Sequence, residues 1–271
     1  MSASIKQHPL YDKMRDQHWR LNNLYHVVDK QGRDVVFKFN AAQQKLYDEM
    51  HYLNVILKAR QLGYSTFIQI YMLDQCLFSS NTTAGVIAHT MRDAATMFNA
   101  KLKYPYDHLP EALRRVRPLV RDSAMELAFS NGSSIRVGTS MRSGTLQFLH
   151  VSELGKIAAK FPEKAREIRT GALNTIDAGQ VVFVESTAEG QEGDFYEMCQ
   201  VARESHNLKR KLTPLDFKFH FAAWWQEPGY TIDPDGVVIT AVMDKYFRCL
   251  ETNHGIVLTP GQKAWYIKKS G

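Results

Sequence analysis

A nine-residue loop, KARQLGYST at Lys58 to Thr66, constrains the fold more than any other stretch of the chain. It follows HYLNVIL, an apolar run typical of a buried strand, and it leads into FIQIYMLDQCLFSS, a sequence typical of a helix. Where a strand, a tight glycine-containing loop and a helix follow one another, exposed backbone N–H groups and the positive end of the helix face an anion. The stretch therefore predicts a phosphate-binding turn between a strand and a helix.

This loop matches the phosphate-binding pattern GxxxxGK[ST], called Walker A, only in part. Gly63 and Ser65 fall at the last glycine and at the hydroxyl residue that binds Mg²⁺. Tyr64 occupies the lysine position, and Lys58 occupies the position of the first glycine. We interpret the stretch as a deviant Walker A loop whose positive charge comes from Lys58 and Arg60. Taken alone, the nine residues also fit an ordinary strand-to-helix turn with a solvated arginine.

Strand and helix patterns alternate along most of the remaining chain. Apolar runs predict strands at 84–89, 146–151, 180–187 and 217–225. Helical spacing predicts helices at 91–106, 162–173 and 195–204. The dipeptide Asn131-Gly132 lies between two alternating stretches and predicts a β-hairpin. This order predicts a three-layer α/β domain with a mainly parallel central sheet, in which ligands bind at the carboxyl ends of the strands.

The ends of the chain differ from this alternating centre. Residues 1–39 mix charges and aromatic residues without a sustained period, so we expect an irregular lead-in with a short hairpin at Gln31-Gly32. Together with residues 40–209 they form the expected main domain. Beyond Pro228 the sequence changes to polar turns and aromatic helical patterns, and we expect residues 210–271 to form a small C-terminal lid or linker subdomain.

Composition limits the class of protein. With 271 residues, 44% of them hydrophobic, the chain can bury one substantial core. The net charge of +6 favours polyanionic partners without requiring them. Three widely spaced cysteines indicate neither a disulfide framework nor a CxxC metal site. No stretch resembles a signal peptide or a membrane span, so we expect neither secretion nor a membrane partner.

Two later strands end in residues that suit nucleotide hydrolysis. Glu153 lies just past the strand 146–151, where a carboxylate could orient an attacking water, although taken alone it fits better as a cap of the next turn or a partner of Lys156. Ser152 stands where a metal-holding aspartate is usual, and a serine could hold only a metal-bound water. Ser186 and Thr187 end the next strand, where small hydroxyl residues could sense the γ-phosphate.

Four motifs in order give the chain a family resemblance. FNAAQ, KARQLGYST, FLHVSE and ESTAEGQEGDFYEMC together resemble the ATPase domain of the large terminase subunit, the DNA-packaging motor of tailed bacteriophages. The resemblance covers residues 36–200, and the closing GQKAWYIKK is similar to the segment that leads out of that domain. It implies a P-loop NTPase fold of the RecA/ASCE type. We expect the family's nuclease domain to be absent from this chain, which would then be a fragment without nuclease activity.

The resemblance implies a role for each matching position. Asn40 and Gln43 match the adenine-recognition motif. The Walker A loop and its nucleotide contacts correspond to Lys58, Arg60, Gln61, Leu62, Gly63, Tyr64, Ser65 and Thr66. Catalysis is implied for Glu153, Arg60 and Lys58, and Mg²⁺ binding for Ser65, Glu153 and, through water, Ser152. The coupling motif corresponds to Ser186, Thr187 and Ala188. Arg142, in the loop before the strand 146–151, is a candidate finger that reaches a neighbouring subunit's site, although it fits an ordinary solvated loop arginine better.

The implied function is an ATP-hydrolysing motor that moves double-stranded DNA into a procapsid, with ATP and Mg²⁺ as cofactors. The implied partners are double-stranded DNA, the portal protein, the small terminase subunit and further copies of this chain in a ring on the portal. The implied location is the cytoplasm of the infected bacterial host cell. Two alternatives stay open: a nucleic-acid-binding module or clamp with a degenerate, non-hydrolysing nucleotide site, and a helicase-like ATPase.

Overall fold

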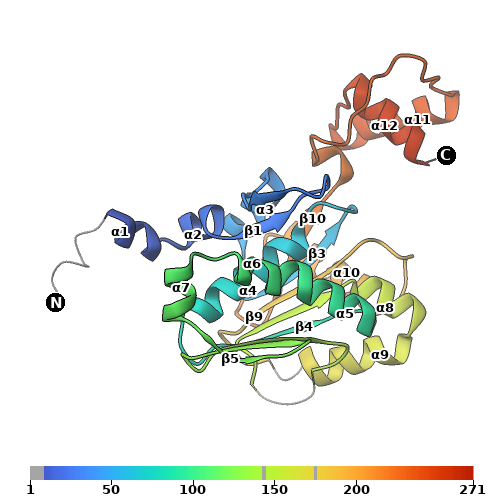
Figure 1. Ribbon diagram of the computed structural model, residues 1–271. Coiled ribbons are helices and arrows are strands. Elements are labelled where there is room, and N and C mark those ends of the chain that lie inside the picture. The colour runs from blue at the N-terminus through green and yellow to red at the C-terminus, as the bar shows by residue number, and fades with distance from the viewer. Residues whose placement is uncertain (1–8, 142–144, 174–175, 271) are drawn as a thin grey trace. The chain divides into compact units, whose positions relative to one another are not determined.

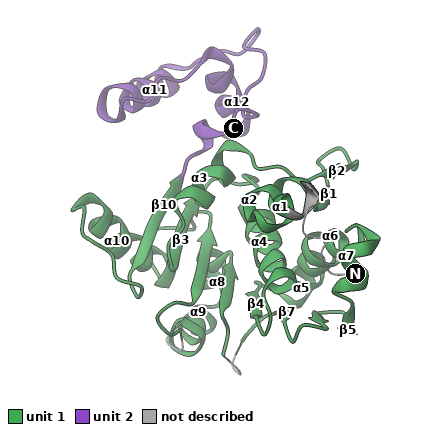
Figure 2. Ribbon diagram, turned by 90° about the vertical axis from the view of Figure 1, so that its left-hand side faces the viewer, with its two compact units in different colours: residues 1–221 green, residues 222–271 purple. Residues whose placement is uncertain are grey.

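The computed structural model describes residues 9–141, 145–173 and 176–270 (Figure 1). The chain divides into two compact units, Met1–Phe221 and Ala222–Gly271, which Figure 2 shows in green and purple. The second unit begins later than the expected boundary at residue 210 because strand β10, Phe217–Ala222, pairs with β3 in the sheet of the first unit. The roles of these units as an ATPase domain and a lid or linker stay predictions.

An eight-stranded sheet forms the centre of the first unit, with the strand order β10-β3-β9-β8-β4-β7-β6-β5. The remaining strands of this sheet are β3 (Leu53–Lys58), β4 (Thr83–Ile87), β5 (Leu119–Asp122), β6 (Glu126–Phe129), β7 (Ser134–Gly138), β8 (Phe148–Ser152) and β9 (Val181–Ser186). Strands β3, β9, β8, β4 and β7 run parallel to one another. Strands β5, β6 and β7 pair antiparallel, and β6 and β7 form the hairpin predicted at Asn131-Gly132. The mainly parallel α/β fold is confirmed.

Helices flank the sheet (Figure 1). They are α3 (Ala41–Glu49), α4 (Tyr64–Phe78), α5 (Met91–Phe98), α6 (Tyr104–Asp107), α7 (Glu111–Val116), α8 (Leu154–Lys160), α9 (Pro162–Glu167) and α10 (Asp194–Asn207). Helix α4 packs on β4, β7 and β8, whereas α8 packs on β9 and α10 on β3. Strands β3, β8 and β9 are near-continuous apolar runs because helices cover both of their faces.

The expectation of an irregular lead-in is wrong for the described part of residues 1–39. This segment forms α1 (Pro9–Arg15), α2 (Gln17–Asn23) and a hairpin of β1 (His26–Val28) and β2 (Asp34–Val36), the last as predicted around Gln31-Gly32. The buried Arg20 of α2 donates from Nε and Nη2 to the carboxylate of Asp74 on α4, at 3.0 and 2.7 Å. An ion pair between such distant positions stabilises α2 without leaving a local pattern in the sequence.

The second unit has a small core of its own. It contains α11 (Ala241–His254) and α12 (Pro260–Ser270), which follow a 3₁₀ turn at Trp224–Gln226. Phe247, Leu250 and Leu258 form its core cluster, and aromatic residues such as Trp224 and Tyr266 pack against it. Tyr230 and Trp265 stack with ring centroids 4.1 Å apart. Across the described residues of both units, no helix combines the length and apolar character that crossing a membrane requires.

Candidate nucleotide-binding site

The loop between β3 and α4 has the backbone form of a phosphate-binding turn. Gly63 occupies the N-cap position of α4 with φ of +77°, in the left-handed region that glycine adopts most readily. Gln61 also has a positive φ, +57°. Ser65 lies in the first turn of α4, where backbone N–H groups have no partner within the helix. The start of α4 therefore offers free donors to an anion.

Asn40 and Gln43 hold this loop in place. The Asn40 side chain accepts from the backbone N–H of Gln43 at 2.8 Å, and Gln43 Oε1 accepts from the N–H of Asn40 at 2.9 Å, so the two form a capping box for α3. Their amide groups donate to the carbonyl oxygens of Leu62 at 3.1 Å and Gly63 at 2.9 Å. Both side chains thus fix the loop backbone in this structure. Adenine recognition by these two residues stays a prediction.

Lys58 brings a positive charge between two carboxylates. Its side chain is 7% exposed, and Nζ lies 3.1 Å from Glu153 Oε1 and 3.0 Å from Glu185 Oε2. Burial opposes the charged form, but the two carboxylates outweigh burial and raise the pKa of Lys58 above its ordinary value. Lys58 therefore stays protonated. It lies near the position where a phosphate would meet the start of α4.

The lysine position of the ordinary Walker A pattern carries no charge here. Tyr64 is buried, and burial raises the pKa of its hydroxyl to about 12. Leu62 is buried as well, while Gln61 and Arg60 line the cavity next to the loop. The cations that border this cavity from the loop are therefore Lys58 and Arg60, the two residues from which the sequence predicts the charge.

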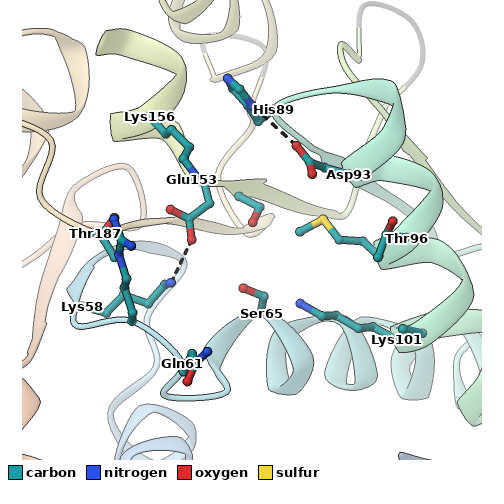
Figure 3. Close-up of a pocket in the computed structure, with 14 residues that line it drawn as sticks. Lys58, Gln61, Ser65, His89, Asp93, Thr96, Lys101, Glu153, Lys156 and Thr187 are labelled. Carbon is teal, nitrogen blue, oxygen red and sulfur yellow. Dashed lines mark hydrogen bonds and ion pairs between the residues drawn. The ribbon is translucent and has the colours of Figure 1, made fainter. Parts of the chain in front are cut away.

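Glu153 lies in the turn between β8 and α8. Its φ and ψ of 58° and 43° put it in the left-handed region, which is uncommon for a residue with a side chain. Its N–H donates to the Glu185 carbonyl oxygen at 2.7 Å, and its Oε2 is 3.5 Å from the Ser186 hydroxyl, which donates to it. Its side chain is 28% exposed and faces the cavity, as Figure 3 shows. The structure thus brings Glu153 together with Lys58.

Sequence reasoning missed Glu185, although it is the most connected residue of the site. Its carboxylate is fully buried and accepts from the hydroxyl groups of Ser65 at 2.6 Å and Ser152 at 2.9 Å. His150 Nε2 lies 3.2 Å from the same oxygen. The only signal in the sequence was an acid that ends the apolar strand QVVFVES.

The charges of Glu185 and His150 follow from their surroundings. Burial raises the pKa of a carboxyl group, but the His150 hydrogen bond and the Lys58 charge outweigh it and hold the pKa of Glu185 below its ordinary value. Burial lowers the pKa of His150, which is therefore neutral at pH 7. The site thus holds one ionised buried carboxylate beside Lys58.

A cavity of about 400 Å³ lies in front of these groups (Figure 3). Lys58, Ser65, Ser152, Glu153 and Thr187 line it together with residues of α5 and the following turn. Its volume lies within the range of small-molecule sites. The predicted phosphate and hydrolysis residues therefore border one shared space.

Lys101 is a second residue that the sequence did not single out. It lies in a π-helical turn, Asn99–Lys103, a kind of distortion that is frequent at functional sites. Figure 3 shows its side chain extending along the cavity toward Ser65. Burial lowers the pKa of Lys101, and the nearby Lys58 charge adds to that effect, while Glu185 opposes it. The cavity is therefore lined by a further lysine besides the lysine and arginine of the Walker A loop, on the segment that follows α5.

The donor set suits Mg²⁺ carried by a nucleotide. Within the described ranges, no group of three or more His, Cys, Asp or Glu residues could hold a metal by itself. Mg²⁺ in nucleotide sites, however, is commonly bound by one or two carboxylates together with substrate phosphates. Oxygen atoms of Ser65, Ser152 and Glu153 line the cavity, and the buried Glu185 lies behind Ser65 and Ser152, whose hydroxyl groups donate to it. These oxygen donors fit a hard cation.

The proposed coupling residues divide between two cavities. Ser186 is buried beside Glu153, and Thr187 lines the cavity described above. Ala188 lines a separate cavity of about 300 Å³, with Phe195 among its other lining residues. The coupling role of this segment stays a prediction. Arg142, the candidate finger, lies outside the described residues.

Comparisons with known proteins agree with this architecture. No protein-family model matches the chain, and no curated protein matches it. Among solved structures, the chain is similar to the large terminase ATPase domain of Thermus phage P74-26, with 17% identity and a TM-score of 0.50 over 70% of this chain and 83% of that one. It is also similar to the large terminase of bacteriophage HK97, with 15% identity and a TM-score of 0.57 over 94% of this chain and 52% of that one. The chain thus spans about half of the HK97 protein. The resemblance predicted from the motifs is therefore confirmed at the level of the fold, which this chain shares with the ATPase domains of phage large terminases.

Proposed function

We propose that this chain is the ATP-hydrolysing motor domain of a viral large terminase subunit. The observation that carries the proposal is the convergence of Lys58, Ser65 and Glu153 on one cavity at the carboxyl ends of β3 and β8. Glu153 is far from Lys58 and Ser65 in the sequence, and an ordinary strand-to-helix turn would not require it to meet them. The shared terminase fold supports the same proposal.

The chemistry follows from what each group can do. The N–H groups at residues 63–66 bind the phosphates, because helix α4 begins there with unpaired donors. Lys58 and Arg60 neutralise the charge that develops on the γ-phosphoryl group, and Glu153 orients the attacking water. Ser65, Glu153 and, through water, Ser152 would hold Mg²⁺, which would neutralise part of the phosphate charge.

Loss of the γ-phosphate has a route to the rest of the protein. The Ser186 hydroxyl donates to Glu153, and Thr187 borders the same cavity, so a change at Glu153 reaches the 186–188 segment directly. We propose that this segment couples hydrolysis to motion of the C-terminal unit, which moves double-stranded DNA into a procapsid. The proposed partners are the portal protein, the small terminase subunit and further copies of the chain in a ring. The proposed location is the cytoplasm of the infected bacterial host cell.

The test compares ATP hydrolysis with binding of the slowly hydrolysed analogue ATPγS, at high protein concentration and with DNA present. We expect Glu153→Gln to bind ATPγS like the wild type but to hydrolyse ATP about 100-fold or more slowly, and Lys58→Ala and Arg60→Ala to lose a similar factor. Glu163→Gln, which changes an exposed glutamate on α9, is the control and keeps wild-type activity.

One observation favours a different function. Tyr64 and Ser152 replace the usual lysine and aspartate, as they would in a nucleic-acid clamp with a degenerate nucleotide site. The same assay separates the two functions. A wild-type protein that hydrolyses no ATP, with ATPγS binding that Glu153→Gln leaves unchanged, would refute the motor and support the clamp.

A further inference from the structure

In the usual pattern an aspartate precedes the catalytic glutamate at the end of the strand. In β8 this position holds Ser152, but the acidic residue Glu185 lies directly beside it. Ser152 ends β8, and its register partner on the parallel strand β9 is Glu185. The Ser152 hydroxyl donates to Glu185 Oε1 at 2.9 Å. A carboxylate is therefore present within hydrogen-bond distance of Ser152, the residue that stands in place of the usual aspartate.

From this geometry we propose that Glu185 replaces the missing aspartate as the outer carboxylate of the cation site: it orients the Ser65 hydroxyl, which holds the divalent cation of the bound nucleotide. The inference deepens the proposed function and rests on it. It assigns to β9 a role that the four sequence motifs assign to β8.

The contact between Glu185 and Ser65 supports this assignment most directly. The Ser65 hydroxyl donates its hydrogen to Glu185 Oε1 at 2.6 Å, so the lone pairs of its oxygen are left for a cation. The carboxylate thereby fixes the orientation of the hydroxyl, as outer partners do for many metal ligands. Ser65 in turn lines the cavity at the start of α4, where phosphates would bind.

The burial of Glu185 also needs an explanation. Its side chain is 0% exposed, and an ionised carboxylate inside a protein is unfavourable unless other charges compensate. Here Lys58 compensates, with Nζ at 3.0 Å from Oε2. Lys58 also faces the cavity and Glu153. The fold thus keeps a buried negative charge directly behind the Ser65 hydroxyl that lines the cavity.

The experiment moves the carboxylate from one strand to the other. The full chain is prepared as wild type, Glu185→Gln, Ser152→Asp with Glu185→Gln, and Glu163→Gln as the control on an exposed helix. Calorimetry measures the affinity for ATPγS with Mg²⁺ and with EDTA, and circular dichroism checks folding. The readout is the gain in affinity that Mg²⁺ gives to each protein, which does not depend on turnover.

We expect Glu185→Gln to reduce the Mg²⁺-dependent gain about 10- to 100-fold, as loss of an outer metal partner does, and the double variant to recover at least tenfold. An unchanged gain in folded Glu185→Gln, or a double variant no better than the single one, would overturn the inference while leaving the ATPase proposal intact. If wild type binds no ATPγS under either condition, both fall.

A second variant tests the inference if Glu185→Gln does not fold. Should Glu185→Gln fail to fold, Glu185→Asp keeps the charge but draws the carboxylate back from Ser65. Its Mg²⁺-dependent gain is expected to fall at least tenfold. A full wild-type gain in that variant contradicts the inference.

Discussion

Gly63 and Gly32 offer a matched test of how tightly the phosphate loop is built. Both residues have φ of +77°, so replacement by alanine imposes the same backbone strain at each. Their surroundings differ. A Cβ at Gly32 would meet nothing within 4 Å, whereas a Cβ at Gly63 would lie 2.5 Å from Gln43 Nε2. Any excess cost at Gly63 therefore measures the contact with Gln43.

The size of the effect follows from the bonds that Gln43 must give up. The left-handed conformation costs an alanine roughly 1–2 kcal/mol, and this is the whole cost expected for Gly32→Ala. Gln43 is nearly buried and cannot yield without losing its bonds to the Gly63 carbonyl and the Asn40 N–H, at 2.9 Å each. Two such bonds contribute about 1–3 kcal/mol. Gly63→Ala should therefore destabilise the protein by about 2–5 kcal/mol.

Thermal unfolding followed by circular dichroism can measure this difference. In a unit of this size, each kcal/mol lowers the midpoint by about 2–4 °C. The decisive variant combines Gly63→Ala with Gln43→Ala, which removes the atom that the new Cβ would meet. In that background Gly63→Ala should cost only what Gly32→Ala costs, which gives a coupling energy of about 1–3 kcal/mol.

Two results would refute this reasoning. Equal midpoints for Gly63→Ala and Gly32→Ala would mean that Gln43 does not confine the loop. Strict additivity of Gly63→Ala and Gln43→Ala would mean that any excess cost has another origin. In either case the bonds from Asn40 and Gln43 would not explain how the loop keeps its shape.

Two further predictions concern buried titratable groups. Lys101→Met should weaken ATPγS binding roughly tenfold, since a hydrogen bond to a charged group contributes about 1.5–3 kcal/mol. Lys103→Met removes a lysine that is already paired with two aspartates and should leave the affinity for ATPγS unchanged. Equal affinities of the two variants in calorimetry would contradict this prediction. Burial, with the Lys218 charge, lowers the pKa of His220 to about 3, while the unfolded chain binds this proton near pH 6.5. Its contribution to stability is therefore present at pH 7 and is lost as pH falls, by about 2 kcal/mol at pH 5. The thermal midpoints at pH 7 and pH 5 should differ more for wild type than for His220→Gln. An equal difference would disprove the lowered pKa of His220.

The parts of the fold that the sequence predicted are those that local chemistry specifies. Strands β3, β8 and β9 are apolar runs because they are buried on both faces, and such runs are visible without any neighbour. The loop before α4 is specified by glycine at a position with positive φ. Glu153 could be found because its place at the end of β8 is a local property.

The parts that sequence reasoning missed depend on contacts between distant segments. Arg20 stabilises α2 through Asp74, and no local period marks that pair. Lys101 lines the cavity from a π-helical turn, and helical spacing alone does not reveal such a turn. Glu185 gains its partners only when β9 lies between β3 and β8.

This last point bears on how substitutions in such sites should be judged. A search along the chain finds serine at the end of β8 and concludes that the acid is lost. In the sheet, the ends of β3, β9 and β8 lie side by side, and parallel register sets Glu185 opposite both Ile56 and Ser152. A carboxylate on the middle strand therefore reaches Ser65 at 2.6 Å as well as Ser152 at 2.9 Å. Cation binding requires a carboxylate near the Ser65 hydroxyl, and either of two adjacent parallel strands can supply it. By itself, the serine at 152 is therefore not sufficient evidence of a degenerate site, because Glu185 near the end of β9 lies next to it, and the variant that combines Ser152→Asp with Glu185→Gln tests this argument.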